Sequence, residues 1–206
     1  MRLYLIRHGR TVLNRKKCYY GVTDAALDET GIRQAIALSS VFRNVKIDRV
    51  ICSPLKRAVH TAELVMQGTG PVPETDDRLM EQNFGIFEGY THRELVEQFP
   101  NEYRSWNEDF SDYHIPEGES FRQVRQRIDS FIKDLPDHGT VLLAAHKGTL
   151  GHLMASLLGL PLEGYWNFVF DQDCYSCLDL EDGFAIIRCL NCPPGREVTG
   201  DKDGSF

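Results

Sequence analysis

Three short apolar runs, each followed by a turn and a helical pattern, constrain the fold of this chain more than any other feature of its sequence. The runs are residues 1–6, 49–52 and 140–145. Their length and apolar character are typical of strands buried on both faces. Helical patterns follow over about residues 30–43, 54–67, 121–135 and 149–158. Strands that alternate with helices predict an α/β fold, a three-layer α/β/α sandwich with a mostly parallel central sheet.

Polar residues at the expected helix starts set the boundaries of these elements. Asp28 is a capping residue for the first helix, and Ser53-Pro54 combines a hydroxyl cap with a first-turn proline. Capping boxes at Thr91–Glu94 and Ser120–Gln123 predict the starts of two more helices. Pro100 is expected to close the helix that begins after Thr91. The segments predicted to lack regular structure are residues 10–27 and 101–117.

Four of the six cysteines form two Cys-x-x-Cys pairs, a spacing found in zinc sites. The pairs are Cys174 with Cys177 and Cys189 with Cys192. The segment that holds them is predicted to be a hairpin of residues 174–181 and 184–190, joined by an Asp182-Gly183 turn. Side chains three residues apart on a strand point to opposite faces, so we expect the thiols of Cys174 and Cys177 to diverge. The same holds for Cys189 and Cys192 if the pairing of the hairpin extends that far. The sequence therefore predicts free thiols and no metal site.

The length and composition fit one globular domain. The chain has 206 residues, 42% of them hydrophobic and 26% charged, which excludes a disordered or fibrous protein. We expect the domain to span residues 1–192 and a disordered tail to span 193–206, which is rich in Gly, Pro and charge. No apolar run is long enough for a membrane span, and charge interrupts the start too early for a signal peptide. We therefore expect a cytoplasmic protein without a membrane partner.

Basic residues gather at the start of an otherwise acidic chain. The net charge of −7 disfavours a nucleic-acid partner. Residues 1–23 nevertheless contain six basic side chains and no acidic one. Such a stretch is either a solvated loop or part of an anion-binding site, and charge alone leaves both readings open.

Two of the predicted strands end in a histidine followed by a glycine-containing turn, and these histidines are His8 and His146. The carboxyl ends of strands in an α/β sheet border one crevice, so we expect the two imidazoles to meet there. Arg7 lies beside His8, and Arg57 lies one turn into the helix after the second strand. Two guanidinium groups at the same crevice would suit bidentate recognition of a phosphate.

Four motifs occur in order along the chain. They are Arg7-His8-Gly9-Arg10-Thr11 with Asn14, Ser53-Pro54-Leu55-Lys56-Arg57, Glu81-x-x-Phe84-Gly85-x-Phe87-Glu88-Gly89, and His146-x-Gly148. Together they resemble the motifs of the histidine phosphatase superfamily, also called the phosphoglycerate mutase-like family. The resemblance covers residues 2–190 and implies the phosphoglycerate mutase-like fold and a phosphatase or mutase activity.

The resemblance also implies a role for each matching residue. His8 would attack phosphorus and carry a phosphohistidine. The groups that would hold the phosphate oxygens are Arg7, Asn14, Arg57 and His146. Glu81 would protonate the departing ester oxygen and then activate water. The predicted catalytic set is therefore His8, Glu81, Arg7, Arg57 and His146, and neither a metal nor a cofactor is implied.

Two positions depart from the family pattern. Arg10 stands where the family commonly has an acid or an amide, and Lys147 stands where it commonly has a glycine. We expect these two cations to favour substrates with more anionic groups, unless their side chains point to solvent. The candidate substrate-binding residues are Arg10, Gly21 and Thr23. The segment 18–27 is similar to the Cys-Tyr-Gly-x-Thr-Asp-x-x-Leu stretch of α-ribazole-5′-phosphate phosphatases, which serve cobalamin nucleotide-loop assembly.

These features favour a small phosphorylated metabolite as the partner. An α-ribazole-5′-phosphate phosphatase-like enzyme is the first interpretation, and a broad-specificity sugar or metabolite phosphatase is the alternative. A phosphoglycerate mutase is less favoured, because the chain has Glu81-Gln-Asn-Phe-Gly85 where mutases have Glu-Arg-His-Tyr-Gly. The sequence leaves both a monomer and a homodimer open.

Overall fold

The computed structural model describes residues 1–195, so residues 196–206 of the predicted tail lie outside the described residues. The described part contains a six-stranded sheet with the order β3-β2-β4-β1-β5-β6. Its strands are β1 (Arg2–Arg7), β2 (Arg49–Cys52), β3 (Glu74–Thr75), β4 (Thr140–Ala145), β5 (Tyr175–Glu181) and β6 (Phe184–Cys192). The α-helices are α1 (Val12–Lys16), α2 (Glu29–Phe42), α3 (Lys56–Met66), α4 (His92–Gln98), α5 (Pro100–Glu108), α6 (Phe121–Lys133) and α7 (Lys147–Leu157).

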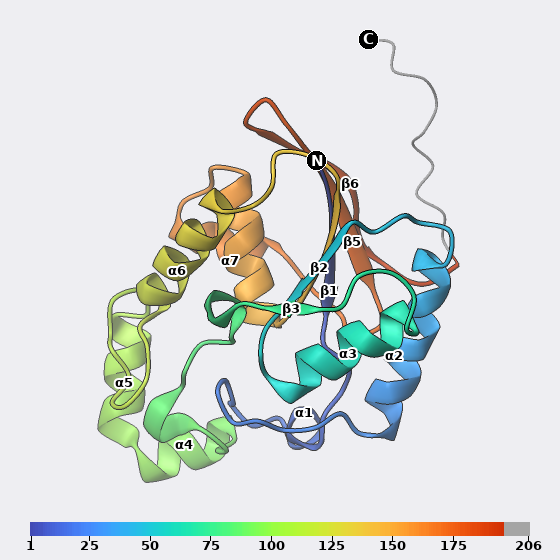
Figure 1. The fold of residues 1–206 in the computed structure, drawn as a ribbon. Helices are drawn as coiled ribbons and strands as arrows, with labels where there is room; N and C mark the ends of the chain where they lie inside the picture. Colours follow the sequence, from blue (N-terminus) through green and yellow to red (C-terminus); the bar gives the residue numbers. More distant parts are fainter. Residues whose placement is uncertain (196–206) are drawn as a thin grey trace.

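The sheet is mostly parallel. Strand β4 lies at its centre and pairs in parallel with both β1 and β2, while β2 pairs in parallel with β3. The C-terminal hairpin is added on the other side, where β5 runs antiparallel to β1 and β6 runs antiparallel to β5. The parallel arrangement brings the carboxyl ends of β1, β2 and β4 to one edge of the sheet (Figure 1).

Helices cover both faces of the sheet (Figure 1). Helices α2 and α3 pack on one face, where Tyr4 and Ile6 of β1 join the buried side chains of these helices. Helices α6 and α7 pack on the other face against Leu3 and Leu5. The alternation along β1 follows from the two-residue period of a strand, since neighbouring side chains point to opposite faces. The predicted three-layer α/β/α fold is confirmed.

A third cluster lies outside the sandwich and supports one side of the carboxyl edge. Phe87, Leu95, Trp106 and Ile115 form its buried centre, with α4 and α5 around them. The segment 101–117 was predicted to be irregular, and this prediction is wrong for its first half because α5 occupies it. Pro100 begins α5 instead of only closing α4, since a proline at the first helical position loses no helical hydrogen bond.

Three other boundaries differ from the prediction. The segment 10–27 contains the short helix α1, which the side chain of Thr11 caps. Helix α3 begins at Lys56 without a side-chain cap, and Ser53 lies before it. Helix α7 begins at Lys147, two residues earlier than expected, directly after His146. These shifts place both Arg57 and His146 at the first turn of their helices, next to the carboxyl edge of the sheet.

The hairpin β5–β6 differs from a regular ladder near its cysteines. Asp182 and Gly183 both have positive φ, 48° and 82°, as the predicted two-residue turn requires. The pairing is irregular near Cys177, and Asn191 is left-handed with φ 50°. As a result Cys189 and Cys192 pack against the same core cluster. The expectation that these two side chains diverge is wrong, because the irregular backbone interrupts the alternation of the strand.

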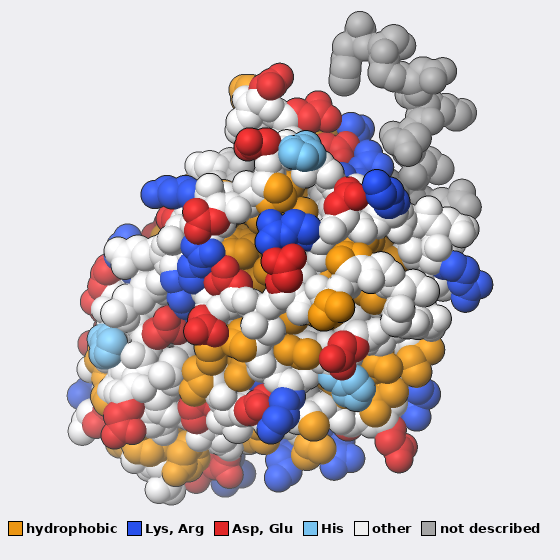
Figure 2. Space-filling view, in the orientation of Figure 1, with side chains coloured by type: hydrophobic (Ala, Val, Ile, Leu, Met, Phe, Trp, Pro, Cys, Tyr) orange, Lys and Arg blue, Asp and Glu red, His pale blue; other side chains and the backbone are white. Residues whose placement is uncertain are grey.

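All six thiols are free, and within residues 1–195 no three His, Cys, Asp or Glu side chains are arranged to hold a metal ion. None of the helices in this range is both long and apolar enough to cross a bilayer. Figure 2 shows acidic and basic side chains interspersed over the face in view.

Candidate active site

The two strand-end histidines meet at the carboxyl edge of the sheet. His8 follows β1 and His146 follows β4, and their ring centroids lie 5.0 Å apart. Both side chains are buried, with relative exposures of 3% and 0%. The parallel pairing of β1 with β4, from Arg2 opposite Thr140 to Arg7 opposite Ala145, puts the two residues side by side. This part of the sequence-based prediction agrees with the geometry.

A cavity of about 290 Å³ opens beside the histidines. Its polar lining residues include Arg7, His8, Asn14, Arg57, Glu81, Lys147 and Gly148. A second group of lining residues is apolar or aromatic: Tyr19, Tyr20, Phe84, Phe121, Val124 and Tyr165. The cavity therefore combines charged side chains with a group of mostly aromatic ones. We call this second group the aromatic wall.

The hydrogen bonds of His8 fix which ring nitrogen carries its proton. Nδ1 lies 2.8 Å from the carbonyl oxygen of Gly9, which can only accept, so Nδ1–H is the donor. Burial, with the nearby charges of Arg57 and Arg7, holds the pKa of His8 well below its ordinary value. The ring is therefore neutral at physiological pH, and its Nε2 retains a lone pair.

His146 has the opposite tautomer. Nε of Arg57 always carries hydrogen and donates to Nδ1 of His146 at 3.2 Å, so the proton of the neutral imidazole lies on Nε2. Burial and the charge of Arg57 lower the pKa of His146 well below its ordinary value. Nε2 of His146 is buried and has no hydrogen-bond partner within the described residues. It is an N–H donor without an acceptor.

Backbone carbonyls hold the two arginines in place. Arg7 donates from Nη1 to the carbonyl of Phe170 at 2.9 Å. Arg57 donates from Nη1 to the carbonyl of Thr23 at 2.9 Å and from Nη2 to that of Gly21 at 2.6 Å. Gly21 and Thr23 do not line the cavity; their contacts orient Arg57.

Glu88 in turn holds the loop that carries those carbonyls. Its carboxylate accepts from the backbone N–H groups of Gly21 at 2.7 Å and of Val22 and Thr23 at 3.1 Å. It also accepts from the N–H of Phe84 at 3.1 Å. Glu88 stands in the third motif, but its function as a brace for the Arg57 loop was not predicted, because the pattern does not show that residues 21–23 fold against it.

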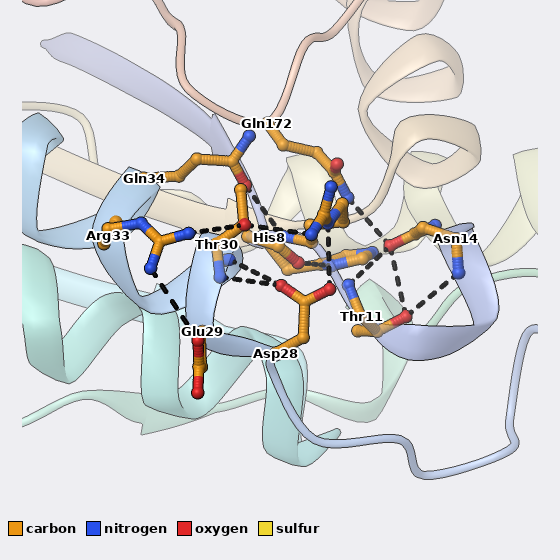
Figure 3. A network of polar contacts seen from close by, with 12 residues as sticks. His8, Thr11, Asn14, Asp28, Glu29, Thr30, Arg33, Gln34 and Gln172 are labelled. Atoms are coloured by element: carbon orange, nitrogen blue, oxygen red, sulfur yellow. Dashed lines mark hydrogen bonds and ion pairs between the residues drawn. The ribbon is translucent and has the colours of Figure 1, made fainter.

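Asn14 lines the cavity, and neighbouring residues hold its amide oxygen. Its Oδ1 accepts from the backbone N–H of Thr11 at 3.0 Å and from Nε2 of Gln172 at 2.8 Å (Figure 3). These contacts occupy the oxygen, and among residues 1–195 Nδ2 of this side chain has no hydrogen-bond partner. Gln172 comes from the loop before β5 and was not predicted, since no motif marks it.

Glu81 also lines the cavity, and backbone groups orient its carboxylate. Oε2 accepts from the N–H of Gly148 at 3.0 Å, and Oε1 accepts from the N–H of Gln82 at 3.1 Å. A Cβ atom at position 148 would clash with this carboxylate. Arg127 supports the same segment from behind, donating to the carbonyl of Glu81 at 3.2 Å and pairing with Glu119 at 3.0 Å.

Arg10 is turned away from the cavity, contrary to its predicted role as a substrate contact. Its Nε donates to Asp28 at 2.8 Å and its Nη2 donates to Thr30 at 2.9 Å; both partners are labelled in Figure 3. Asp28 also caps α2, so it is a fixed anion that holds the guanidinium at the start of this helix. Of the two cations that depart from the family pattern, only Lys147 lines the cavity.

The basic side chains at the start of the chain thus differ in role, since some belong to the candidate anion-binding site and others are solvated. Arg7 belongs to the cavity, Arg10 is paired with Asp28, and Arg15, Lys16 and Lys17 are exposed on and after α1. The aromatic wall was not predicted, because its side chains come from separate elements and form no local pattern.

Comparison with known proteins agrees with this geometry. The model of the family named histidine phosphatase superfamily (branch 1) matches residues 3–193. The chain belongs to the histidine phosphatase superfamily. The family identified from the four motifs is therefore confirmed, and the match includes every element that contributes to the cavity.

Two similar histidine phosphatases carry the same functional name. The adenosylcobalamin/alpha-ribazole phosphatase of Salmonella typhimurium is 37% identical over 194 residues, 93% of this chain and 96% of that protein. The crystal structure of the alpha-ribazole phosphatase from Shigella flexneri superposes with a TM-score of 0.89 at 38% identity, covering 96% of this chain and 100% of that one. Phosphoserine phosphatase 1 of Hydrogenobacter thermophilus is 28% identical over 194 residues, which are 93% of this chain and 92% of that protein.

Proposed function

We propose that this histidine phosphatase hydrolyses a phosphomonoester through a phosphohistidine on His8. The observation that carries the proposal is the complementary state of the two buried imidazoles. His8 offers a lone pair on Nε2, and His146 offers an N–H on Nε2, within one cluster whose ring centroids lie 5.0 Å apart. A nucleophile beside an unpaired donor suits attack on a phosphoryl group whose oxygens gain charge.

The phosphate oxygens are bound by four side chains in this proposal. Arg7 and Arg57 supply guanidinium N–H groups, His146 supplies Nε2–H, and Asn14 supplies Nδ2–H. Each of these groups is oriented before substrate arrives, because other protein atoms hold the rest of the side chain. Preorganised donors around the transferred group are the main source of rate enhancement in phosphoryl transfer.

Glu81 acts as the acid and then as the base. In the first step Nε2 of His8 forms a bond to phosphorus, the ester P–O bond breaks, and protonated Glu81 gives its proton to the leaving oxygen. In the second step the Glu81 carboxylate takes a proton from water, the water oxygen attacks phosphorus, and the P–N bond to His8 breaks. All of these roles belong to protein side chains, so turnover is expected to persist in a chelator.

An α-ribazole-5′-phosphate-like ester is the substrate that we propose. The alpha-ribazole phosphatases named above support it at 37–38% identity over nearly the whole chain. The aromatic wall supports it independently, because a planar apolar leaving group can stack on such rings. A broad-specificity phosphatase is the competing proposal, since the chain also resembles a phosphatase that is named for a different ester, phosphoserine.

The proposed chemistry is tested by trapping the intermediate. Rapid acid-free quenching of the protein with a radiolabelled phosphomonoester should leave acid-labile, base-stable label on His8, and His8→Ala should abolish both labelling and turnover. Normal turnover by His8→Ala would disprove the mechanism. Loss of wild-type activity in a chelator would disprove the proposal that the reaction needs no metal ion.

The substrate is tested with a panel of α-ribazole 5′-phosphate, 3-phosphoglycerate, phosphoserine and fructose bisphosphate. We expect kcat/KM for the first compound to exceed the others by at least about tenfold, the selectivity that one well-filled apolar subsite provides. Comparable values across the panel would instead favour a broad-specificity phosphatase.

A further inference from the structure

One polar side chain of the cavity has no part in the proposed phosphoryl transfer. His152 lies on α7 and lines the cavity, although only 1% of its surface is exposed. Its ring packs between Phe121, at a centroid distance of 4.2 Å, and Tyr165, at 4.9 Å. Both neighbours belong to the aromatic wall, so the imidazole is held in a fixed orientation among apolar rings.

The Nδ1 atom of His152 is buried and has no hydrogen-bond partner within residues 1–195. Only three other side-chain atoms in this range share that condition, and two of them belong to Arg7 and His146 at the phosphate end of the cavity. A buried polar atom without a partner is costly, so its retention calls for an explanation. A ligand that supplies the missing partner is one such explanation, as it is for His146.

The position of His152 along α7 suggests that its side chain contacts the leaving group of the substrate and not the phosphate. Gly148, which donates to the carboxylate of Glu81, precedes it by four residues on the same helix. Residues four apart lie on one face of a helix, separated by a rise of roughly 6 Å. His152 therefore lies one helical turn along α7 from Gly148, the residue whose N–H binds the Glu81 carboxylate.

We propose that His152 is a specificity-determining residue whose imidazole forms a hydrogen bond with a hydroxyl group of the leaving alcohol, next to the aromatic wall. This inference rests on the proposed function and adds to it a residue that recognises the sugar-like part of the leaving group. A hydroxyl group suits the site because it can both donate and accept, as a neutral imidazole can.

The electrostatic setting of the ring agrees with a neutral partner. Burial and the charges of Arg127 and Arg125 lower the pKa of His152 to about 3, so the ring is uncharged in the physiological range. An anionic group at this position would lose its hydration against Phe121 and Tyr165. The two nearby cations are already paired, Arg125 with Asp129 and Arg127 with Glu119. A neutral hydroxyl group loses less hydration free energy than an anion when it enters such a site.

The test compares two esters that differ only in hydroxyl groups, α-ribazole 5′-phosphate and its 2′,3′-dideoxy analogue. For the wild-type protein we expect kcat/KM to be higher for the ribose ester. His152→Phe keeps a flat ring between Phe121 and Tyr165 but removes the hydrogen bond. It should lower the ratio of the two kcat/KM values by roughly 3- to 12-fold, the effect of one neutral hydrogen bond. His152→Asn places an amide near the position of Nδ1, and His152→Gln places one near that of Nε2. One of these two variants should restore part of the ratio that His152→Phe loses.

The readout is a ratio, so a variant that merely perturbs the fold lowers both values and leaves the ratio unchanged. An unchanged ratio in His152→Phe and in both amide variants would overturn the inference. Binding of the two esters to His8→Ala, measured by calorimetry with and without His152→Phe, gives the same comparison without turnover. If the wild-type protein hydrolysed neither ester, the proposed substrate would be wrong, while this binding comparison would still decide the role of His152.

Discussion

Arg57 donates a hydrogen bond from Nε to Nδ1 of His146 at 3.2 Å, and this single contact sets the chemistry of the second histidine. Because a guanidinium N–H cannot accept, the imidazole must present a lone pair at Nδ1 and its proton at Nε2. Nη1 and Nη2 of Arg57 each donate one N–H, to the carbonyls of Thr23 and Gly21, and each keeps a second N–H. One arginine thus fixes a tautomer, anchors a loop and contributes charge to the cavity.

The buried histidines predict a loss of stability in mild acid. Burial holds the pKa values of His8, His146 and His152 below their ordinary value of 6.5. Below pH 6.5 the unfolded chain therefore binds protons that the folded chain does not, so stability is full above this pH and falls as the pH drops. Three such groups remove about 4 kcal/mol between pH 7.5 and 5.5. Urea denaturation at the two pH values measures this loss.

His152→Phe provides the matched comparison for that experiment. Its pH-dependent loss between the same two pH values should be about one third smaller, because one of the three histidines has been removed. A loss equal to that of the wild-type protein would show that His152 is protonated in the folded state.

Glu88→Gln should weaken phosphate binding although Glu88 does not touch the phosphate site directly. The amide replaces one of two acceptor oxygens that hold the N–H groups of residues 21–23, so the carbonyls that orient Arg57 lose their fixed position. We expect the inhibition constant of inorganic phosphate to rise about tenfold, the effect of a lost charge-assisted hydrogen bond.

Glu94→Gln is a suitable control for Glu88→Gln. Glu94 also accepts backbone and hydroxyl hydrogen bonds, from Thr91, but it caps α4 at the surface. Phosphate inhibition should be unaffected by this variant. Equal inhibition constants for Glu88→Gln and the wild-type protein would contradict the proposed support of Arg57.

Gly148→Ala should lower activity without unfolding the protein. The added methyl group would occupy the position of the Glu81 carboxylate, which is the movable end of a flexible side chain. The displaced acid should reduce kcat/KM for an alkyl phosphate by about 100-fold, within the range of general acid catalysis. The reduction should be much smaller for 4-nitrophenyl phosphate, whose leaving group needs little protonation. Equal reductions for both esters would argue for distorted binding instead of a lost acid.

Asn14→Asp tests the amide orientation. The oxygen bound by Thr11 and Gln172 would remain, whereas the unpaired Nδ2 would become a second carboxylate oxygen facing the phosphate. Like-charge repulsion should make Asn14→Asp at least about tenfold less active than Asn14→Ala, which only removes the donor. Steady-state kinetics on both variants measures the difference, and an Asp variant as active as the Ala variant would place Nδ2 outside the phosphate site.

Local patterns were sufficient for most of the sandwich. The apolar runs over β1, β2 and β4 and the caps at Asp28 and Ser120 depend on neighbouring residues only, so the sequence shows them directly. The meeting of His8 and His146 follows from one rule of α/β sheets, that the carboxyl ends of parallel strands share an edge.

The remaining features depend on contacts between distant residues. Arg10 was predicted to reach the substrate, but Asp28, 18 positions away, holds it at the start of α2. The brace of Glu88 on residues 21–23 spans more than 60 positions, and no motif links the two segments.

The sequence by itself determined the layers of the sandwich, the four motifs and the types of groups that meet beside His8, because strand period, helix caps and residue chemistry are local properties. Only the tertiary structure decided which nitrogen of each imidazole bears the proton, which cations face the cavity, and that His152 packs between Phe121 and Tyr165 of the aromatic wall. Hydrogen-bond partners and ring packing join residues far apart in the chain, and folding alone brings them together.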